Sequence, residues 1–197
     1  MKKTNEKPRI LAFAGSTRKG SFNKIILKYA VEGAKRAGAE VTVIDLKDYP
    51  MPLYDGDLEK EEGIPEKGKE LFELMIHNHG FLIASPEYNS GVSGVLKNAI
   101  DWVSRPVPNF KPLAAFDGKV AAIISASPGA LGGIRGLAAL RAILSNIKVI
   151  VLPNQMAVPK VNDKVDETGI LRDEKKQHAL EAIGEHLTEI LVKLNAN

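Results

Sequence analysis

Five short, continuously apolar runs recur along the chain, and longer amphipathic segments separate them. An apolar run that does not alternate with polar residues indicates a strand covered on both faces, as in a parallel sheet. The pattern therefore predicts five buried strands. They fall at residues 10–14, 41–44, 81–84, 120–124 and 149–152.

Each run is followed by a segment whose apolar residues recur every three or four positions, the spacing of an amphipathic helix. Gly38 follows the first of these segments and favours a helix C-terminus there. Pro65 precedes the second and suits a first helical turn. The predicted helices contain the apolar stripes at residues 26–34, 71–75, 95–103, 137–144 and 179–194.

This strict alternation of strand and helix predicts an α/β fold, a three-layer sandwich with right-handed crossovers. Two longer connections, residues 47–63 and 153–172, are polar and contain proline and glycine. We expect both to be surface excursions of one domain that covers residues 1–197.

Composition narrows the function classes. The 197 residues are 44% hydrophobic and 26% charged, with a net charge of +3, which is too balanced to indicate a nucleic-acid partner. The chain has no cysteine, so disulfides, thiolate nucleophiles and cysteine metal sites are excluded. No apolar stretch has the length of a membrane span or a signal peptide. We expect a cytoplasmic protein without a membrane partner.

The first strand runs into a polar loop, "GSTRKGSFN" at residues 15–23, where a helix is predicted to begin. A helix start leaves N–H groups unpaired and carries partial positive charge. Hydroxyl, amide and cationic side chains gathered there are suited to a phosphate group. The alternative is that Ser21 or Asn23 only caps the helix and that the cations are solvated. The side chains concerned are Ser16, Thr17, Arg18, Lys19, Ser21 and Asn23.

Known dinucleotide and nucleoside-triphosphate loops do not fit this sequence. Thr17 stands where the Rossmann pattern G-x-G-x-x-G needs its second glycine. Gly15 and Gly20 have the Walker A separation, but Ser21-Phe22 replaces its Lys-Ser/Thr pair. A hydroxyl-rich loop better suits one terminal phosphomonoester. That is the phosphate of flavin mononucleotide (FMN) in a flavodoxin-like sheet with strand order 2-1-3-4-5.

Two further loops are predicted at the same end of the sheet. In the 2-1-3-4-5 order the first and third strands are neighbours, so "SPEYN" at residues 85–89 faces the first loop. Its proline, amides and aromatic side chain suit a flavin ring, although an ordinary loop with Tyr88 exposed would look the same. "SASPGALGGIRG" at residues 125–136 has four glycines. Ser127 and Gly129 could approach the ring, or the glycines could serve tight strand–helix packing.

These motifs resemble those of the NADPH-dependent FMN reductase family. "GSTRKGSFN" is similar to its phosphate loop G-S-x-R-x-x-S-x-N, and "SPEYNSGVSGVLKNAIDWVSR" is similar to its P-E-Y-N ring loop and the following helix. The chain departs from the family where Val92-Ser93 occupy a stretch that often carries proline. The resemblance implies FMN binding by Ser16, Thr17, Arg18, Ser21, Phe22 and Asn23 at the phosphate end, Pro86, Glu87, Tyr88 and Asn89 at the ring, and Ser127 and Gly129 at its opposite edge.

The resemblance also implies the reaction. NADPH (or NADH) would pass hydride to FMN, and the electrons would leave to a small acceptor such as a quinone, a flavin, an azo compound or chromate. Neither a catalytic side-chain pair nor a metal site is expected, because the cofactor performs the chemistry. A homodimer or homotetramer is implied. Two alternatives remain: a flavodoxin-like electron carrier, which the net charge of +3 disfavours, and a nucleotide-binding module or hydrolase without flavin.

Overall fold

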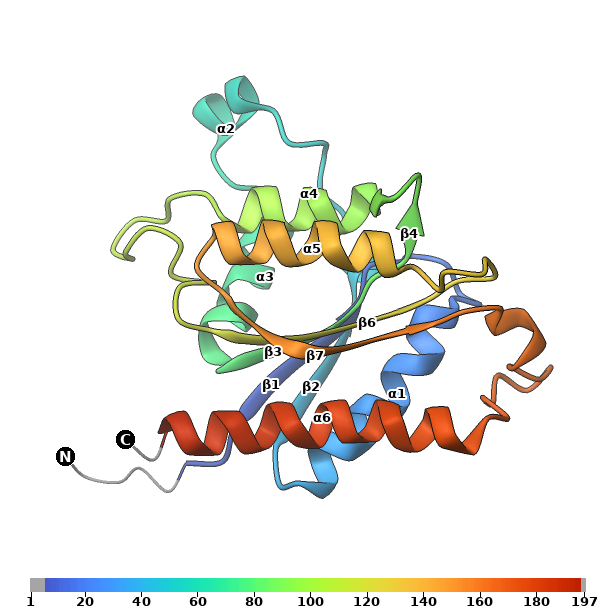
Figure 1. Cartoon of the computed structure of the whole chain (residues 1–197). Coiled ribbons are helices and arrows are strands. Elements are labelled where there is room, and N and C mark those ends of the chain that lie inside the picture. Colours follow the sequence, from blue (N-terminus) through green and yellow to red (C-terminus); the bar gives the residue numbers. More distant parts are fainter. Residues whose placement is uncertain (1–5, 196–197) are drawn as a thin grey trace.

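Five parallel strands form the central sheet of the computed structural model, which describes residues 6–195. The strand order β2-β1-β3-β6-β7 confirms the predicted order 2-1-3-4-5. The sheet lies in the middle of the molecule, between two layers of helices (Figure 1). The strands are β1 (Arg9–Ala14), β2 (Glu40–Asp45), β3 (Gly80–Ala84), β6 (Val120–Ala126) and β7 (Ile150–Val158).

Two helical layers cover the two faces of the sheet, as the alternating pattern predicts (Figure 1). Neighbouring residues of β1 belong to different cores: Ile10 and Ala12 pack on one side, and Leu11 and Phe13 on the other. Among the described helices none has the length and apolar content needed to cross a membrane. The first layer consists of α1 (Phe22–Arg36) and α6 (Glu174–Asn195), and the second of α3 (Glu66–His77), α4 (Gly94–Val103) and α5 (Ile134–Asn146).

The two long connections carry more structure than the sequence predicts. Residues 47–63 include α2 (Gly56–Glu62), which stands apart from the body above α4 (Figure 1). The surface excursion predicted at 153–172 is wrong over its first part, because β7 continues to Val158. A bulge between the pairs Ala121–Val151 and Ile123–Gln155 contains Pro153, and beyond it β7 pairs with β6 again in a shifted register. Arg141 donates to the carbonyl oxygens of Val151 and Leu152 within that bulge. Short 3-10 turns occupy Leu46–Asp48 and Val161–Asp163.

Helices α1 and α6 touch backbone to backbone. A Cβ atom built on Gly33 would lie 2.0 Å from the carbonyl oxygen of Glu181, and one on Gly184 would lie 1.9 Å from that of Ala30. Thr188 donates across the same contact to the carbonyl oxygen of Ala34 at 3.4 Å. No larger residue fits at the two glycines without separating the helices.

We therefore predict that Gly184→Ala lowers the free energy of unfolding by roughly 1–3 kcal/mol, because backbone cannot give way to the added methyl group. Gly94→Ala is the matched control, since Gly94 also lies in a helix and nothing stands within 4 Å of its Cβ position. Urea denaturation measures both. Equal midpoints for the two variants would contradict the close contact.

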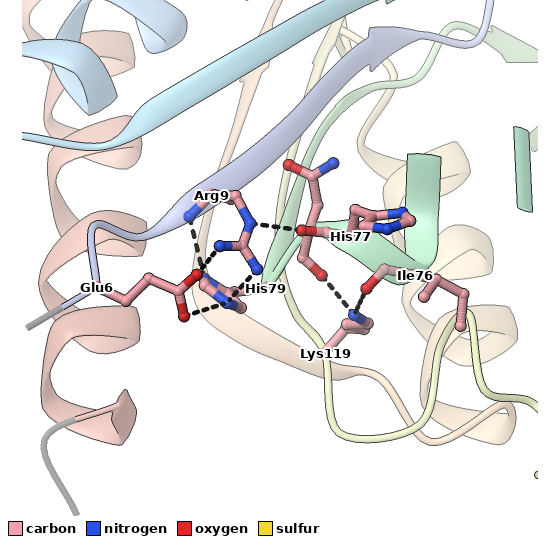
Figure 2. Close-up of polar contacts among 7 residues, drawn as sticks. Glu6, Arg9, Ile76, His77, His79 and Lys119 are labelled. Atoms are coloured by element: carbon pink, nitrogen blue, oxygen red, sulfur yellow. Dashed lines mark hydrogen bonds and ion pairs between the residues drawn. The ribbon is translucent and has the colours of Figure 1, made fainter. Parts of the chain in front are cut away.

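A polar cluster lies at the end of the sheet where β1, β3 and β6 begin. The loops that follow these strands lie at the other end. The imidazole Nδ1 of His79 accepts the backbone N–H of Arg9 at 3.1 Å, and the Arg9 guanidinium lies beside the ring and pairs with Glu6 (Figure 2). Lys119 donates to the carbonyl oxygens of Ile76 and Asn78 at the end of α3. Burial, with the nearby Arg9 charge, lowers the pKa of Lys119 to about 8.

Burial, and secondly the charge of Arg9, lower the pKa of His79 below its ordinary value of 6.5. Between this lowered pKa and 6.5 the unfolded chain binds more protons than the folded one, so stability falls as pH falls from 6.5 through the lowered pKa. We predict that His79→Gln flattens this loss, because it removes the titrating group. Free energies of unfolding measured across this pH range check it; parallel curves for the variant and the wild type would show that His79 does not contribute.

Candidate functional site

Three loops meet where β1, β3 and β6 end. Their strands are held in register by Gly15 N–H donating to the carbonyl oxygen of Ala84 at 2.9 Å, and by Ser85 N–H donating to that of Ile124 at 2.8 Å. Between the loops lies a cavity of about 220 Å³, the mouth cavity. It is lined by Ser16, Arg18, Ser21, Phe22, Asn23, Pro86, Glu87, Tyr88, Ala126, Ser127 and Pro128.

The first loop presents hydroxyl groups and a cation to the mouth cavity. Ser16 and Ser21 are buried, whereas Arg18 is exposed. Ser21 holds the N-cap position of α1 but makes no side-chain capping bond, and the first turn of α1 has no acidic residue. Within residues 6–195 the Arg18 guanidinium has no ion-pair partner. The hydroxyl group of Ser21 and the cation of Arg18 are thus available to an anion, together with the partial positive charge of the helix start.

Asn23 joins the first loop to the third. Its side chain is 3% exposed and makes two hydrogen bonds with the backbone of one residue. The amide nitrogen donates to the carbonyl oxygen of Ala126, and the amide oxygen accepts the N–H of Ala126, both at 3.0 Å. Asn23 therefore does not cap α1, and both groups of its amide are bonded to the third loop.

The second loop is a short β-hairpin of β4 (Glu87–Tyr88) and β5 (Gly91–Val92). The turn residues Asn89 and Ser90 have positive φ values, 50° and 65°. Of the two residue types, asparagine is the one that adopts this conformation more often. The Tyr88 side chain is 53% exposed beside the mouth cavity. A planar aromatic group held on a tight hairpin can offer its face to a ligand.

Ser93 is a residue of this site that the sequence motifs did not single out. It caps α4 by accepting the N–H of Leu96 at 3.3 Å, and it donates to the carbonyl oxygen of Gly15 at 2.6 Å. The second loop is thereby attached to the first. Only the capping role has a signal in the sequence, namely a serine directly before a helix.

The glycines of the third loop are explained by close packing. A Cβ atom on Gly132 would lie 2.7 Å from the backbone of Val158 and Pro159, and one on Gly133 would lie 2.0 Å from the Ser125 hydroxyl oxygen. Both glycines also have positive φ values, 63° and 95°. This supports the strand–helix packing alternative for the glycines. Ser127 lines the mouth cavity, with its hydroxyl oxygen accepting the N–H of Gly129 at 3.1 Å.

The structure brings nine of the twelve predicted cofactor-binding residues to the mouth cavity. Thr17 instead lines a separate cavity of about 170 Å³ with Tyr49 and Val95. Asn89 lies at the exposed hairpin tip, and Gly129 lies outside the cavity lining. Ala126 and Pro128, which the motifs did not indicate, complete the wall.

A larger groove of about 510 Å³ lies between α1 and the edge strand β2. Its walls include Leu27, Val31 and Val43, and Lys24 pairs with Asp45 at its rim. Burial alone would raise the pKa of Asp45, but hydrogen bonds from Lys24 and the N–H of Lys47 bring it below its ordinary value. The groove has no cluster of hydroxyl groups, so its size does not make it the better phosphate site.

The model of the family described as NADPH-dependent FMN reductase matches residues 8–163. This chain belongs to that family. It is 39% identical over 174 residues to a quinone reductase of Escherichia coli K12, an alignment that covers 86% of this chain and 88% of the relative. It is 34% identical over 174 residues to an NAD(P)H-dependent FMN reductase of Pseudomonas aeruginosa, covering 88% and 89%.

Solved structures agree. The flavoenzyme NAD(P)H:(acceptor) oxidoreductase FerB from Paracoccus denitrificans superposes with a TM-score of 0.78 at 26% identity, covering 94% of this chain and 98% of that one. The chain is therefore an NAD(P)H-dependent FMN reductase with the flavodoxin-like fold.

The side chains around the mouth cavity suit the charge of FMN, because its phosphate group is anionic. Glu87 is the only acidic residue among those that line it, and the Glu87 carboxylate accepts the N–H of Gly136 at 2.8 Å, on the side of α5. A phosphate group entering the first loop would meet hydroxyls, N–H groups and a guanidinium. These are the donors that hold a phosphomonoester.

Proposed function

We propose that this reductase passes electrons from NADPH or NADH through FMN held in the mouth cavity to a small acceptor, with quinones as the leading class. The observation that carries the proposal is the meeting of the hydroxyl and guanidinium loop with the hairpin loop in one cavity at the ends of β1 and β3. FMN, when bound, supplies a ring that exchanges hydride and electrons. The names of the relatives, quinone reductase and FMN reductase, support the acceptor class.

The side chains divide the work of binding. Ser16, Ser21 and Arg18 hold the phosphate, and Phe22 and Asn23 shape the wall behind them. Backbone atoms of Glu87 and Asn89, with Pro86 and the Tyr88 side chain, receive the ring, and Ser127, with Gly129 behind it, closes the opposite edge. Thr17 flanks the phosphate loop on its outer side. No side chain needs to act as nucleophile or general base.

We also propose that the whole chain acts as one FMN-binding domain and assembles as a homodimer or homotetramer in the cytoplasm. Residues 1–5 and 196–197 of that domain lie outside the described residues. Helix α2 has no buried residue, and Leu53 beside it is 81% exposed. An apolar side chain on a protruding segment supports a contact with a second copy.

The proposed function is tested by adding NADPH or NADH to the FMN-loaded protein without oxygen and recording flavin absorbance. We predict that the absorbance bleaches on mixing and returns when a quinone is added, and that steady-state turnover follows with both added. A protein that stays yellow would instead support an electron carrier. The likeness to an archaeal flavodoxin, with a TM-score of 0.60 at 10% identity, shows the fold alone.

Arg18→Ala tests the phosphate end. If the guanidinium makes a charge-assisted contact, its loss costs roughly 1.5–3 kcal/mol, so the FMN dissociation constant rises roughly 10- to 100-fold. Riboflavin, which lacks the phosphate, should bind the variant and the wild type equally. Lys19→Ala is the control, because Lys19 is a neighbouring exposed cation outside the cavity lining. An unchanged FMN affinity in Arg18→Ala would refute this role.

A further inference from the structure

The Glu87 side chain bridges the second loop and the start of α5. Its carboxylate accepts the N–H of Gly136 at 2.8 Å and lies 3.4 Å from Nε of Arg135. Gly136 is in the first turn of α5, where N–H groups have no partner within the helix. The helix has no capping bond from its own N-cap residue, Gly133, and no acidic residue in its first turn. Glu87, from 49 residues away, supplies both a hydrogen-bond acceptor and the negative charge.

The packing around this contact is tight. A Cβ atom on Gly136 would lie 3.0 Å from Cβ and 3.2 Å from Cγ of Glu87, and one on Gly133 would lie 3.6 Å from the same Cβ. The Glu87 side chain is only 11% exposed, whereas that of Arg135 is 60% exposed. Two of the third-loop glycines therefore form the flat surface on which Glu87 rests, and Arg135 covers the contact from outside.

We propose that Glu87 is a positioning residue: by capping α5 it fixes the hairpin loop against the third loop, and so sets the part of the mouth cavity that receives the flavin ring. Glu87 and its neighbours Pro86 and Tyr88 line the cavity on one side, and Ser127 and Pro128 line it on the other. The carboxylate itself is turned to α5 and acts through the loop. This inference rests on the proposed function of the mouth cavity.

The contact acts on the ring end and leaves the phosphate end unchanged. The first loop is attached to the other two by different residues, through Asn23 to Ala126 and through Ser93 to Gly15. Loss of the Glu87 contact leaves both attachments in place. It removes only the hydrogen bond and the ion pair between the hairpin and the start of α5.

The experiment compares Glu87→Ala with Glu87→Gln, which keeps an oxygen that can accept the Gly136 N–H. Asp55→Ala is the matched control, because Asp55 also caps a helix, α2, by accepting the N–H of Asp57 at 2.8 Å, away from the cavity. The measurements are hydrogen exchange of the Gly136 amide, dissociation constants of FMN and riboflavin, and the visible spectrum of bound FMN. Thermal unfolding confirms that each variant is folded.

We expect faster Gly136 exchange in Glu87→Ala, an altered flavin spectrum, and dissociation constants of FMN and riboflavin that rise by the same factor, about 5- to 30-fold. Asp55→Ala should match the wild type within about twofold, and Glu87→Gln, which keeps the hydrogen-bond acceptor but loses the negative charge, should lie between Glu87→Ala and the wild type in Gly136 exchange and in flavin affinity. An equal rise for both flavins separates a ring effect from the phosphate effect of Arg18.

Three results would overturn the inference. Unchanged Gly136 exchange in Glu87→Ala excludes the cap, and faster exchange with unchanged flavin binding and spectrum leaves the cap without a role at the ring. If Glu87→Ala does not fold, Glu87→Gln decides, and a loss of riboflavin affinity in that variant with Gly136 exchange at the wild-type rate contradicts the capping account. A wild-type protein that binds neither flavin would overturn the proposed function itself, whatever Gly136 shows.

Discussion

The parallel register of β1, β3 and β6 is the constraint on which the site depends. Ala14 pairs with Ala84, and Ala84 pairs with Ile124, so β1 and β3 end level with each other and β6 runs two residues further, to Ala126. Each chain segment must then leave the sheet at the same edge, because all three strands point the same way. The topology of the sheet alone therefore brings residues from three distant parts of the sequence together there.

Cross-loop hydrogen bonds then give the mouth cavity its shape. Each pair of loops has its own attachment: Ser93 to Gly15, Asn23 to Ala126, and Glu87 to Gly136. In each, a side chain of one loop is bonded to a backbone group of another, so the loop geometry is fixed before a ligand arrives. This preorganisation reduces the entropy lost on binding. The close backbone contact of α1 with α6 fixes the helix that follows the phosphate loop.

The mouth cavity and the polar cluster lie at opposite ends of the sheet. The loops that follow β1, β3 and β6 keep unpaired donors near the cavity, as in Arg18 and Ser21. At the opposite end, the side chains of Arg9 and His79 are bonded to each other, and Lys119 donates to backbone carbonyl oxygens (Figure 2). His79 and Lys119, whose pKa values burial lowers, thus lie away from the mouth cavity.

Local pattern determined the five strands, the order of helices between them and the phosphate and ring motifs, because apolar periodicity and loop chemistry are properties of neighbouring residues. Tertiary structure alone decided the rest. β7 reaches Val158 through polar residues because β6 and Arg141 complete its hydrogen bonds. The amide of Asn23 and the carboxylate of Glu87 find partners 103 and 49 residues away, and no local pattern encodes the direction in which a side chain turns toward a distant backbone group.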